Sequence, residues 1–234
     1  MSKMKSFYRL EMLVLGLFAL GLLIGVALYF IDSSAFSTYV EEDGVVEWTT
    51  VVALVSCAAI NILRFFRLRK QKTKLFLGIL LAASLALLFG VGEELSWGQR
   101  IFKFESGDFF NTYNTEKEVN LHNLQFGPVK LDKLIFSLLL SILICVYIFA
   151  LPVLYRLLKI VKQWVDDLAI PVLQNYQLIA FGALIIAIGV IHDMRKWELL
   201  EMCAVLLLLV ILLDPLNKEI YMRPQKTENG KVSE

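Results

Sequence analysis

The sequence predicts an all-α membrane protein, a polytopic helix bundle of about six transmembrane helices, and three observations lead to this prediction. The 234-residue chain is 58% hydrophobic, and its mean hydropathy of +0.66 is far above that of a soluble domain. Its apolar residues form long runs, and a helix needs about 20 such residues to cross the hydrocarbon core. Basic residues concentrate on alternate connections between these runs, as cytoplasmic connections do.

The runs define a single bundle domain over residues 1–224, followed by a polar tail, 225–234, that we expect to be a disordered cytoplasmic segment. The expected spans are 12–31, 46–66, 75–95, 134–155, 172–191 and 197–213. The first apolar run is too long for the core of a secretion signal, so we expect it to be a retained helix. The last run is short and begins with Glu198 and Glu201, so its first turns should be polar.

Charge places both termini in the cytoplasm. With that orientation, 16 of the 23 Lys and Arg residues fall on the inner side, and 15 of the 22 Asp and Glu residues fall on the outer side. Such an excess of basic residues is typical of cytoplasmic loops. The net charge of +1 gives no reason to expect nucleic acid as a partner.

Two connections have a distinct composition. Residues 156–168 carry apolar residues at helical spacing with basic residues between them, as in an interfacial connector helix. The outer loop 101–133 should be ordered, because it is too rich in aromatic residues for a disordered linker. Its aromatic residues are Phe102, Phe104, Phe109, Phe110, Tyr113 and Phe126. Aromatic side chains favour the lipid interface, so we expect this loop to fold over the outer mouth of the bundle as a short helix or lid.

The third span ends in the stretch on which the functional prediction depends, GEELSWGQR at residues 92–100. An ionisable residue costs about 2.5–3.5 kcal/mol at the centre of a span and less near the interface, so its presence is a functional hypothesis. Helical geometry points Glu93 and Glu94 about 100° apart, so one of them should enter the bundle. The alternative is that Arg100 only neutralises one of these carboxylates at the end of the helix.

Further polar residues collect on the same side of the membrane. They are Glu47, Trp97, Gln99, Asn120, His122, His192, Asp193, Glu198 and Glu201. Polar residues also cluster at helix ends without any functional role, and the acidic run 41–43 has the composition of a solvated face. The three cysteines lie in apolar runs, where they act as small hydrophobic residues.

Carboxylates and imidazoles are the ligands of a catalytic zinc ion, which takes three protein ligands and a water. The candidate metal ligands are His122, His192, Glu93 and Glu94, gathered from distant segments. The remaining glutamate or Asp193 would be the acid or base. Ser96 and Arg100 would orient the substrate or stabilise an oxyanion.

The pattern GEELSWGQRIF, followed about twenty residues later by NLHN at 120–123, resembles a group of uncharacterised bacterial multi-pass membrane proteins. That resemblance implies a bacterial inner membrane, and the distribution of Lys and Arg places the site on its extracytoplasmic side.

A partial resemblance links the chain to alkaline ceramidases and related CREST membrane hydrolases. It is carried by Glu47-Trp48-Thr49-Thr50-Val51, where a span opens with a Glu beside an aromatic residue, and it implies a zinc-dependent hydrolase. The family's paired histidines are not matched, because Lys196 stands four residues after His192. The EExxxR motif of CAAX-type intramembrane proteases is not matched either, since Gly98 occupies the arginine position.

The resulting hypothesis is a metal-dependent hydrolase that acts on a lipid or lipid-linked substrate at the outer leaflet. The alternative is a non-enzymatic subunit of a membrane or envelope complex that binds a membrane protein partner. A transporter is less favoured, because the span centres are nearly free of the ionisable groups that transporters carry at the midplane.

Overall fold

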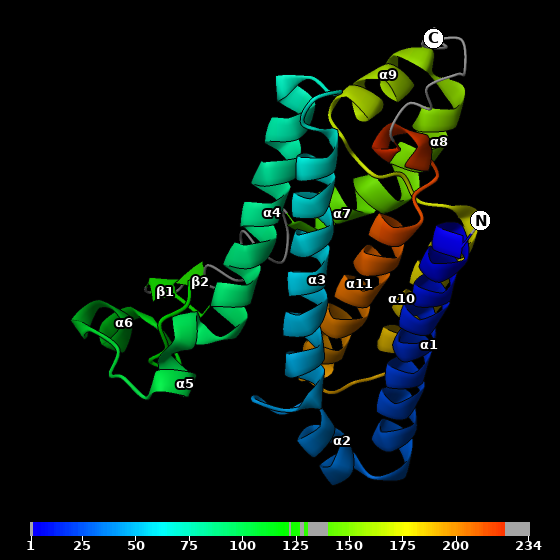
Figure 1. The fold of residues 1–234 in the computed structure, drawn as a ribbon. Helices are drawn as coiled ribbons and strands as arrows, with labels where there is room; N and C mark the ends of the chain where they lie inside the picture. The colour runs from blue at the N-terminus through cyan, green and yellow to red at the C-terminus, as the bar shows by residue number, and fades with distance from the viewer. Residues whose placement is uncertain (1, 122, 127–128, 131–139, 223–234) are drawn as a thin grey trace, which may run out of the picture.

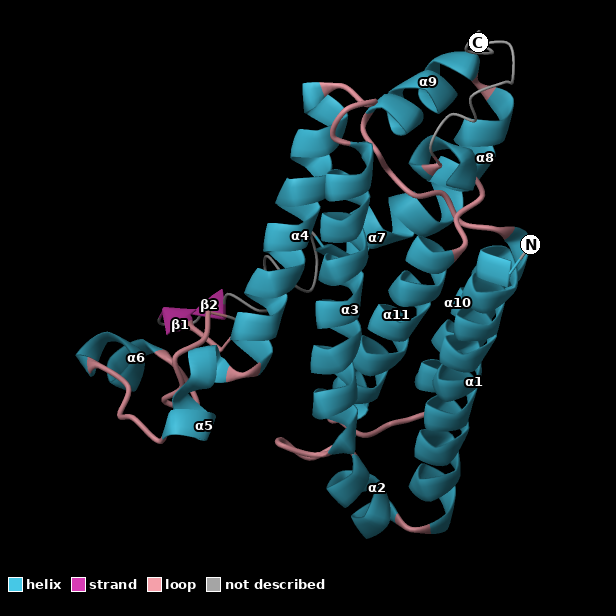
Figure 2. Ribbon diagram, viewed as in Figure 1, coloured by secondary structure: helices cyan, strands magenta, loops and turns pink. Residues whose placement is uncertain are grey.

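The computed structural model describes residues 2–121, 123–126, 129–130 and 140–222. Helices dominate this part of the chain (Figure 2). The strands in it are β1 (Gln125–Phe126) and β2 (Val129–Lys130), an antiparallel pair in which Gln125 faces Lys130. The prediction of an all-α protein is confirmed.

The helices follow the predicted spans closely in the first half of the chain and less closely in the second. They are α1 (Ser2–Ile31), α2 (Ser33–Tyr39), α3 (Val45–Leu68), α4 (Lys74–Glu94), the short η1 (Ser96–Gly98), α5 (Gln99–Phe102), α6 (Asp108–Tyr113), α7 (Leu140–Cys145), the π-helical η3 (Val146–Ala150), α8 (Leu151–Leu157), α9 (Lys159–Asp167), α10 (Asn175–Gly189), α11 (Lys196–Leu213) and η4 (Lys218–Tyr221). Part of the expected span 134–155, residues 134–139, and the tail 225–234 lie outside the described residues.

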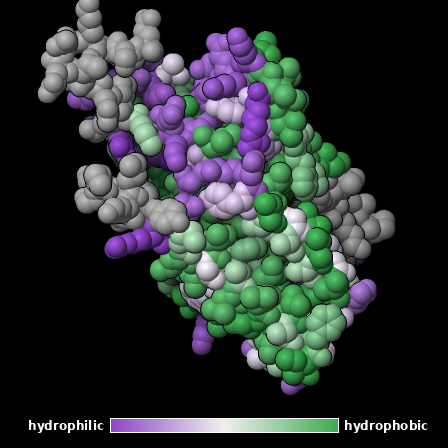
Figure 3. All heavy atoms as spheres, turned by 90° about the vertical axis from the view of Figure 1, so that its right-hand side faces the viewer, coloured by the Kyte–Doolittle hydropathy of each residue, from purple (hydrophilic) through white to green (hydrophobic). Residues whose placement is uncertain are grey.

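Within the described residues, three helices are long and apolar enough to cross a membrane, namely α1 over Arg9–Ile31, α3 and α4. A fourth crossing results if Ile142–Leu157 and Lys159–Asp167 are counted as one broken span. The two helices are bent by 119° relative to each other. Helix α10 has only 15 residues, and the 18 residues of α11 include three charged ones in its first two turns. Figure 3, which views the side of the bundle that carries α1, shows a broad apolar surface with hydrophilic residues gathered toward one end.

The helix α11 forms the centre of the bundle. It packs against α1, α3 and α10, and the side chains of Leu199, Met202 and Leu207 are buried. A Cβ at Gly21 would lie 2.7 Å from the Met202 side chain, and one at Gly25 would lie 2.5 Å from Leu199. Small residues four apart let two membrane helices approach closely, so these glycines explain how α1 reaches α11.

A buried asparagine joins the segment after α11 to the irregular chain before α10. The Oδ1 of Asn217 accepts the backbone N–H of Val172 at 3.0 Å, and its Nδ2 donates to Asp166 at 3.0 Å and to the carbonyl of Ile170 at 2.9 Å. Buried polar groups need such partners. The start of α1 and η4 lie toward this same end of the bundle (Figure 1).

Residues 95–126, which we term the outer segment, leave the bundle where α4 ends. This segment contains α5, α6 and β1, and a bridge between Asn114 and Leu124 closes it. It lies beside the lower end of α4, on the side away from α1, α10 and α11 (Figure 1). Its described part folds into short helices and a strand, and it stands beside the bundle (Figure 1).

Candidate outer-leaflet site

The chain reverses direction after α4 through three consecutive left-handed residues. Ser96, Trp97 and Gly98 have φ values of 45°, 51° and 85°. Only glycine adopts this conformation freely, and each other residue costs about 1–3 kcal/mol, a strain that clusters at functional sites. The Trp97 indole folds back over Gly92, where a Cβ would lie 3.0 Å from the ring. This turn sends Arg100 back toward the start of α3.

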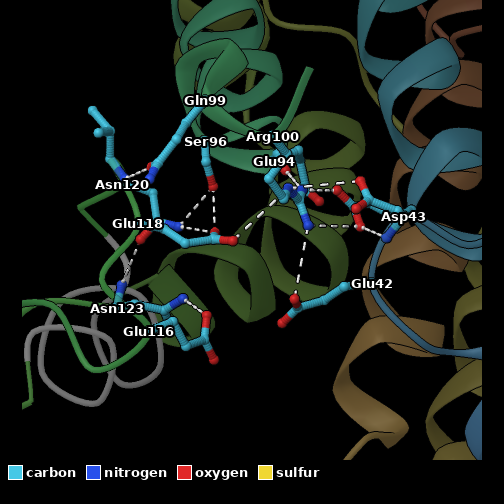
Figure 4. Close-up of polar contacts among 12 residues, drawn as sticks. Glu42, Asp43, Glu94, Ser96, Gln99, Arg100, Glu116, Glu118, Asn120 and Asn123 are labelled. Carbon is cyan, nitrogen blue, oxygen red and sulfur yellow. Dashed lines mark hydrogen bonds and ion pairs between the residues drawn. The ribbon is translucent and has the colours of Figure 1, made fainter. Parts of the chain in front are cut away.

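The Arg100 side chain is the centre of the site (Figure 4). Its guanidinium pairs with the carboxylate of Glu47 and donates to the backbone carbonyl of Glu94. Glu47 stands in the first turn of α3, and its side chain is only 9% exposed. It also accepts the backbone N–H of Asp43 at 2.6 Å. Neutralisation of Glu93 or Glu94 was the alternative role for Arg100, and the structure adds a pairing with Glu47 from 53 residues earlier.

Three further carboxylates surround the same guanidinium. The Asp43 and Glu118 carboxylates lie 3.7 Å and 3.9 Å from Nε, and Glu42 lies 3.9 Å from Nη1. Burial lowers the pKa of Arg100, but Glu47 and the other carboxylates outweigh it and raise that pKa overall. Partial burial, followed by repulsion from Glu116 and Glu118, raises the pKa of Glu42. The site therefore carries an excess of negative charge.

A second group of contacts fixes residues 118–120 of the outer segment to the turn with which that segment begins. Ser96, which is 0% exposed, donates to the Glu118 carboxylate. The Asn120 amide donates to Ser96 Oγ at 3.1 Å and to Glu118 at 3.0 Å. The Gln99 Oε1 accepts the backbone N–H of Val119 at 2.7 Å. Together these bonds hold residues 118–120 against the turn (Figure 4).

The Glu93 carboxylate completes this attachment. It is buried, and it accepts the Trp97 indole N–H at 2.9 Å and the backbone N–H of Leu121 at 2.6 Å. Glu94 is only partly buried, so the two glutamates differ in burial, as their helical spacing predicted. The EELSWGQR stretch thus binds the start of α3 on one side and residues 118–121 on the other.

The structure brings together most of the candidate residues of the third span and the loop. Those that share direct contacts are Glu47, Glu93, Glu94, Ser96, Trp97, Gln99, Arg100 and Asn120. Sequence reasoning missed Glu118 and Asn114, which donates to Asn120 Oδ1 at 2.8 Å. Glu118 stands in a polar loop, and nothing in its spacing distinguishes it from Glu105 or Glu116.

The candidates near the last helix belong to a separate turn between α10 and α11. The His192 Nδ1 lies 3.1 Å from the carbonyl of Val190, and its backbone N–H donates to the Tyr29 hydroxyl at 3.1 Å. Asp193 accepts the backbone N–H of Arg195 at 2.7 Å. Glu198 and Glu201 lie in the first two turns of α11. The hydrogen bonds described here for His192 and Asp193 stay within this turn or reach α1, and they do not reach the Arg100 site.

The predicted zinc ligands do not converge within the part of the chain that the structure describes. There, no three His, Cys, Asp or Glu side chains are grouped so as to hold a metal ion. His122 lies outside the described residues, so the set of His122, His192, Glu93 and Glu94 stays a prediction.

Comparisons of the chain with protein-family models, with curated proteins and with solved structures found no match. The function is therefore argued from the geometry of the site.

Proposed function

We propose that the network around Arg100 is the functional site of an integral membrane protein that hydrolyses a lipid or lipid-linked substrate at the outer leaflet. The supporting observation is the convergence of Glu47 from α3, Arg100 from the turn after α4, and Glu118 from the outer segment. Burying the charged side chains of this network costs desolvation free energy, and apolar residues could hold the loop equally well. The use of charged residues here therefore favours a functional role. Groups with perturbed pKa values cluster at functional sites.

The described residues offer an acid or base next to a cation. Glu42 is largely exposed, it lies 3.9 Å from Arg100, and its pKa is raised, which favours proton transfer nearer neutral pH. In the proposed reaction, Glu42 accepts a proton from the attacking water and returns it to the leaving group. Arg100 stabilises the negative charge that develops on the substrate. Ser96 is buried and positions Glu118 rather than attacking the substrate.

The zinc prediction is a separate matter, because His192 lies in the α10–α11 turn and not beside Arg100; the predicted ligands His122 and His192 can be tested directly. Elemental analysis of detergent-purified protein should find near-stoichiometric divalent metal that His122→Ala and His192→Ala both remove. Metal-free, well-folded parent protein would reject the zinc site but not the carboxylate and guanidinium chemistry.

The proposed topology has six crossings, both termini in the cytoplasm and the Arg100 site on the extracytoplasmic side of a bacterial inner membrane. The distribution of Lys and Arg supports this orientation, and α10 and α11 would supply the fifth and sixth crossings. Reporter fusions after residues 70 and 222 should mark the cytoplasm, and a fusion after residue 194 should mark the periplasm. A cytoplasmic signal at residue 194 would reject the six-span arrangement.

The hydrolase proposal is tested in nanodiscs that contain a bacterial lipid extract, with product release followed by mass spectrometry. The parent protein should release a headgroup or acyl product, and Glu42→Gln should abolish the release without lowering thermal stability. Glu41→Gln is the matched control, since Glu41 is its exposed neighbour and is not one of the four carboxylates described within 4 Å of Arg100. Equal product release by Glu42→Gln and the parent would refute the assignment of Glu42.

A second candidate function is a non-enzymatic subunit of a membrane complex. It is favoured by the full burial of Ser96 and by its two hydrogen bonds to the outer segment, since a network that holds a loop needs no substrate. A protein that releases no lipid product, yet co-purifies at fixed stoichiometry with a membrane protein lost in Arg100→Met, would support this function.

A further inference from the structure

The outer segment carries large apolar side chains that the fold leaves exposed. They are Trp97, Ile101, Phe102, Phe104, Phe109, Tyr113 and Phe126. Phe102 is the most exposed of them, at 78%. Contiguous exposed apolar patches on proteins mark interaction sites. We therefore expect a protein partner or lipid to cover this surface.

This surface is continuous with the lipid-facing surface of α4. Leu85 and Phe89 are exposed on α4, which is one of the three helices able to cross a membrane. The Phe89 ring lies 5.5 Å from the Trp97 ring in an edge-to-face contact, and Ile101 and Phe102 follow on α5. The exposed apolar surface of a membrane span therefore runs directly onto the outer segment.

The aromatic residues farther along are held as a group. The Tyr113 ring lies 5.3 Å from Phe109 and 5.1 Å from Phe126, so the rings of α6 and β1 support one another. Each of the three still leaves about two-fifths or more of its surface exposed. Because these rings already support one another, they lose little conformational entropy when lipid or another protein covers them.

The position of the outer segment indicates that membrane lipid covers these side chains. The outer segment lies beside the end of α4, and α2 extends farther along the bundle axis than α5 and α6 do (Figure 1). The buried Asn120 and the partly buried Glu118 face the turn after α4. A surface beside a spanning helix, at the level where that helix ends, borders the headgroups and upper acyl chains. Aromatic residues are enriched at that depth.

We propose that the outer segment is an interfacial membrane element that inserts Phe102, Phe109 and Phe126 into the outer leaflet beside α4. Its partner is the lipid of that leaflet. The insertion stands independently of any reaction. Its consequence for the site rests on the proposed hydrolase: with the segment inserted, Arg100 lies at headgroup level, and a lipid substrate reaches it sideways from the leaflet.

Depth measurement in liposomes tests this proposal. In a Cys145→Ser background, in which Cys57 and Cys203 are buried, a nitroxide is attached at Phe102→Cys or Phe109→Cys. The matched controls are Thr115→Cys, an exposed polar position of the same segment, and Glu41→Cys in the exposed turn between α2 and α3. Accessibility of the nitroxide to oxygen and to a water-soluble nickel complex is read by power saturation.

Labels at Phe102 and Phe109 should show at least a threefold higher ratio of oxygen to nickel accessibility than both controls. Equal nickel accessibility at all four positions would overturn the insertion and would favour a protein partner for this surface. Each labelled variant is also assayed for lipid product. Insertion without hydrolysis keeps this inference and rejects the proposed function, and hydrolysis without insertion does the reverse.

Discussion

Replacing Arg100 with methionine should destabilise the protein more than the loss of any single surface charge. The substitution keeps much of the side-chain volume but leaves the carboxylates of Glu47 and Glu118 without their cation. Two unit charges about 4 Å apart attract by about 4 kcal/mol near a protein surface, and desolvation offsets much of this. Removing one partner of a buried pair costs about 3–5 kcal/mol. The Arg100 side chain is 17% exposed, so we expect about 3 kcal/mol.

The buried thiols of Cys57 and Cys203 provide the assay. In a Cys145→Ser background, a thiol-reactive dye reports thermal unfolding in detergent, and Arg100→Met should lower the unfolding temperature clearly. Adding Glu47→Gln should recover part of the loss, because it removes the unpaired buried charge. The coupling free energy of this double-mutant cycle should be about 2 kcal/mol, within the range for residues in contact.

Two further measurements locate the effect. Trypsin should cleave Arg100→Met faster than the parent after Lys103 and Lys117 in the outer segment, because its attachment to α3 is lost. Arg195→Met is the matched control, since Arg195 lies in the exposed α10–α11 turn and should cost less than about 0.5 kcal/mol. The reasoning fails if Arg100→Met costs less than about 1 kcal/mol, or if Glu47→Gln brings no recovery.

Three other substitutions test separate parts of the structure. Glu42→Gln should raise the unfolding temperature at neutral pH. The pKa of Glu42 is raised in the folded state, so its negative charge lowers stability at pH values above that pKa. In a pH series, the gain in unfolding temperature should disappear in acid, below the pKa of Glu42 in the unfolded chain. Asn217→Ala should cost about 2 kcal/mol in chemical unfolding, because it leaves the buried N–H of Val172 unpaired. Gly25→Val should cost about 1–3 kcal/mol in the thiol assay, because its Cβ would lie 2.5 Å from Leu199 and overpack the contact; an unchanged midpoint would refute that contact.

The sequence predicted the long helices well because each is marked by a run of apolar residues that local composition reveals. The expected spans 12–31, 46–66 and 75–95 fall within α1, α3 and α4 to within a residue. The span at 172–191 was less accurate, since α10 begins only at Asn175. There a capping box between Gln174 and Gln177 starts the helix, and the hydropathy of the preceding residues does not reveal it.

The site was predictable in part, for a related reason. Glu93, Ser96 and Arg100 are conspicuous because they belong to one tight run of polar and charged residues directly after an apolar span. Their partners were not predictable, because the left-handed turn at 96–98 decides where Arg100 points, and no local preference of Ser96 or Trp97 favours that conformation. Glu118 became a member of the site only through the loop closure between Asn114 and Leu124.

The contact of Gly21 and Gly25 with α11 also constrains how the protein is made. Helix α1 is synthesised well before α11, so it cannot make this contact until residues 32–195 between them have been synthesised. Until then its glycine face is open to other helices and to membrane proteases. A chain that stops before α11 would lack the central helix of the bundle, so quality control has a simple way to distinguish finished molecules from unfinished ones.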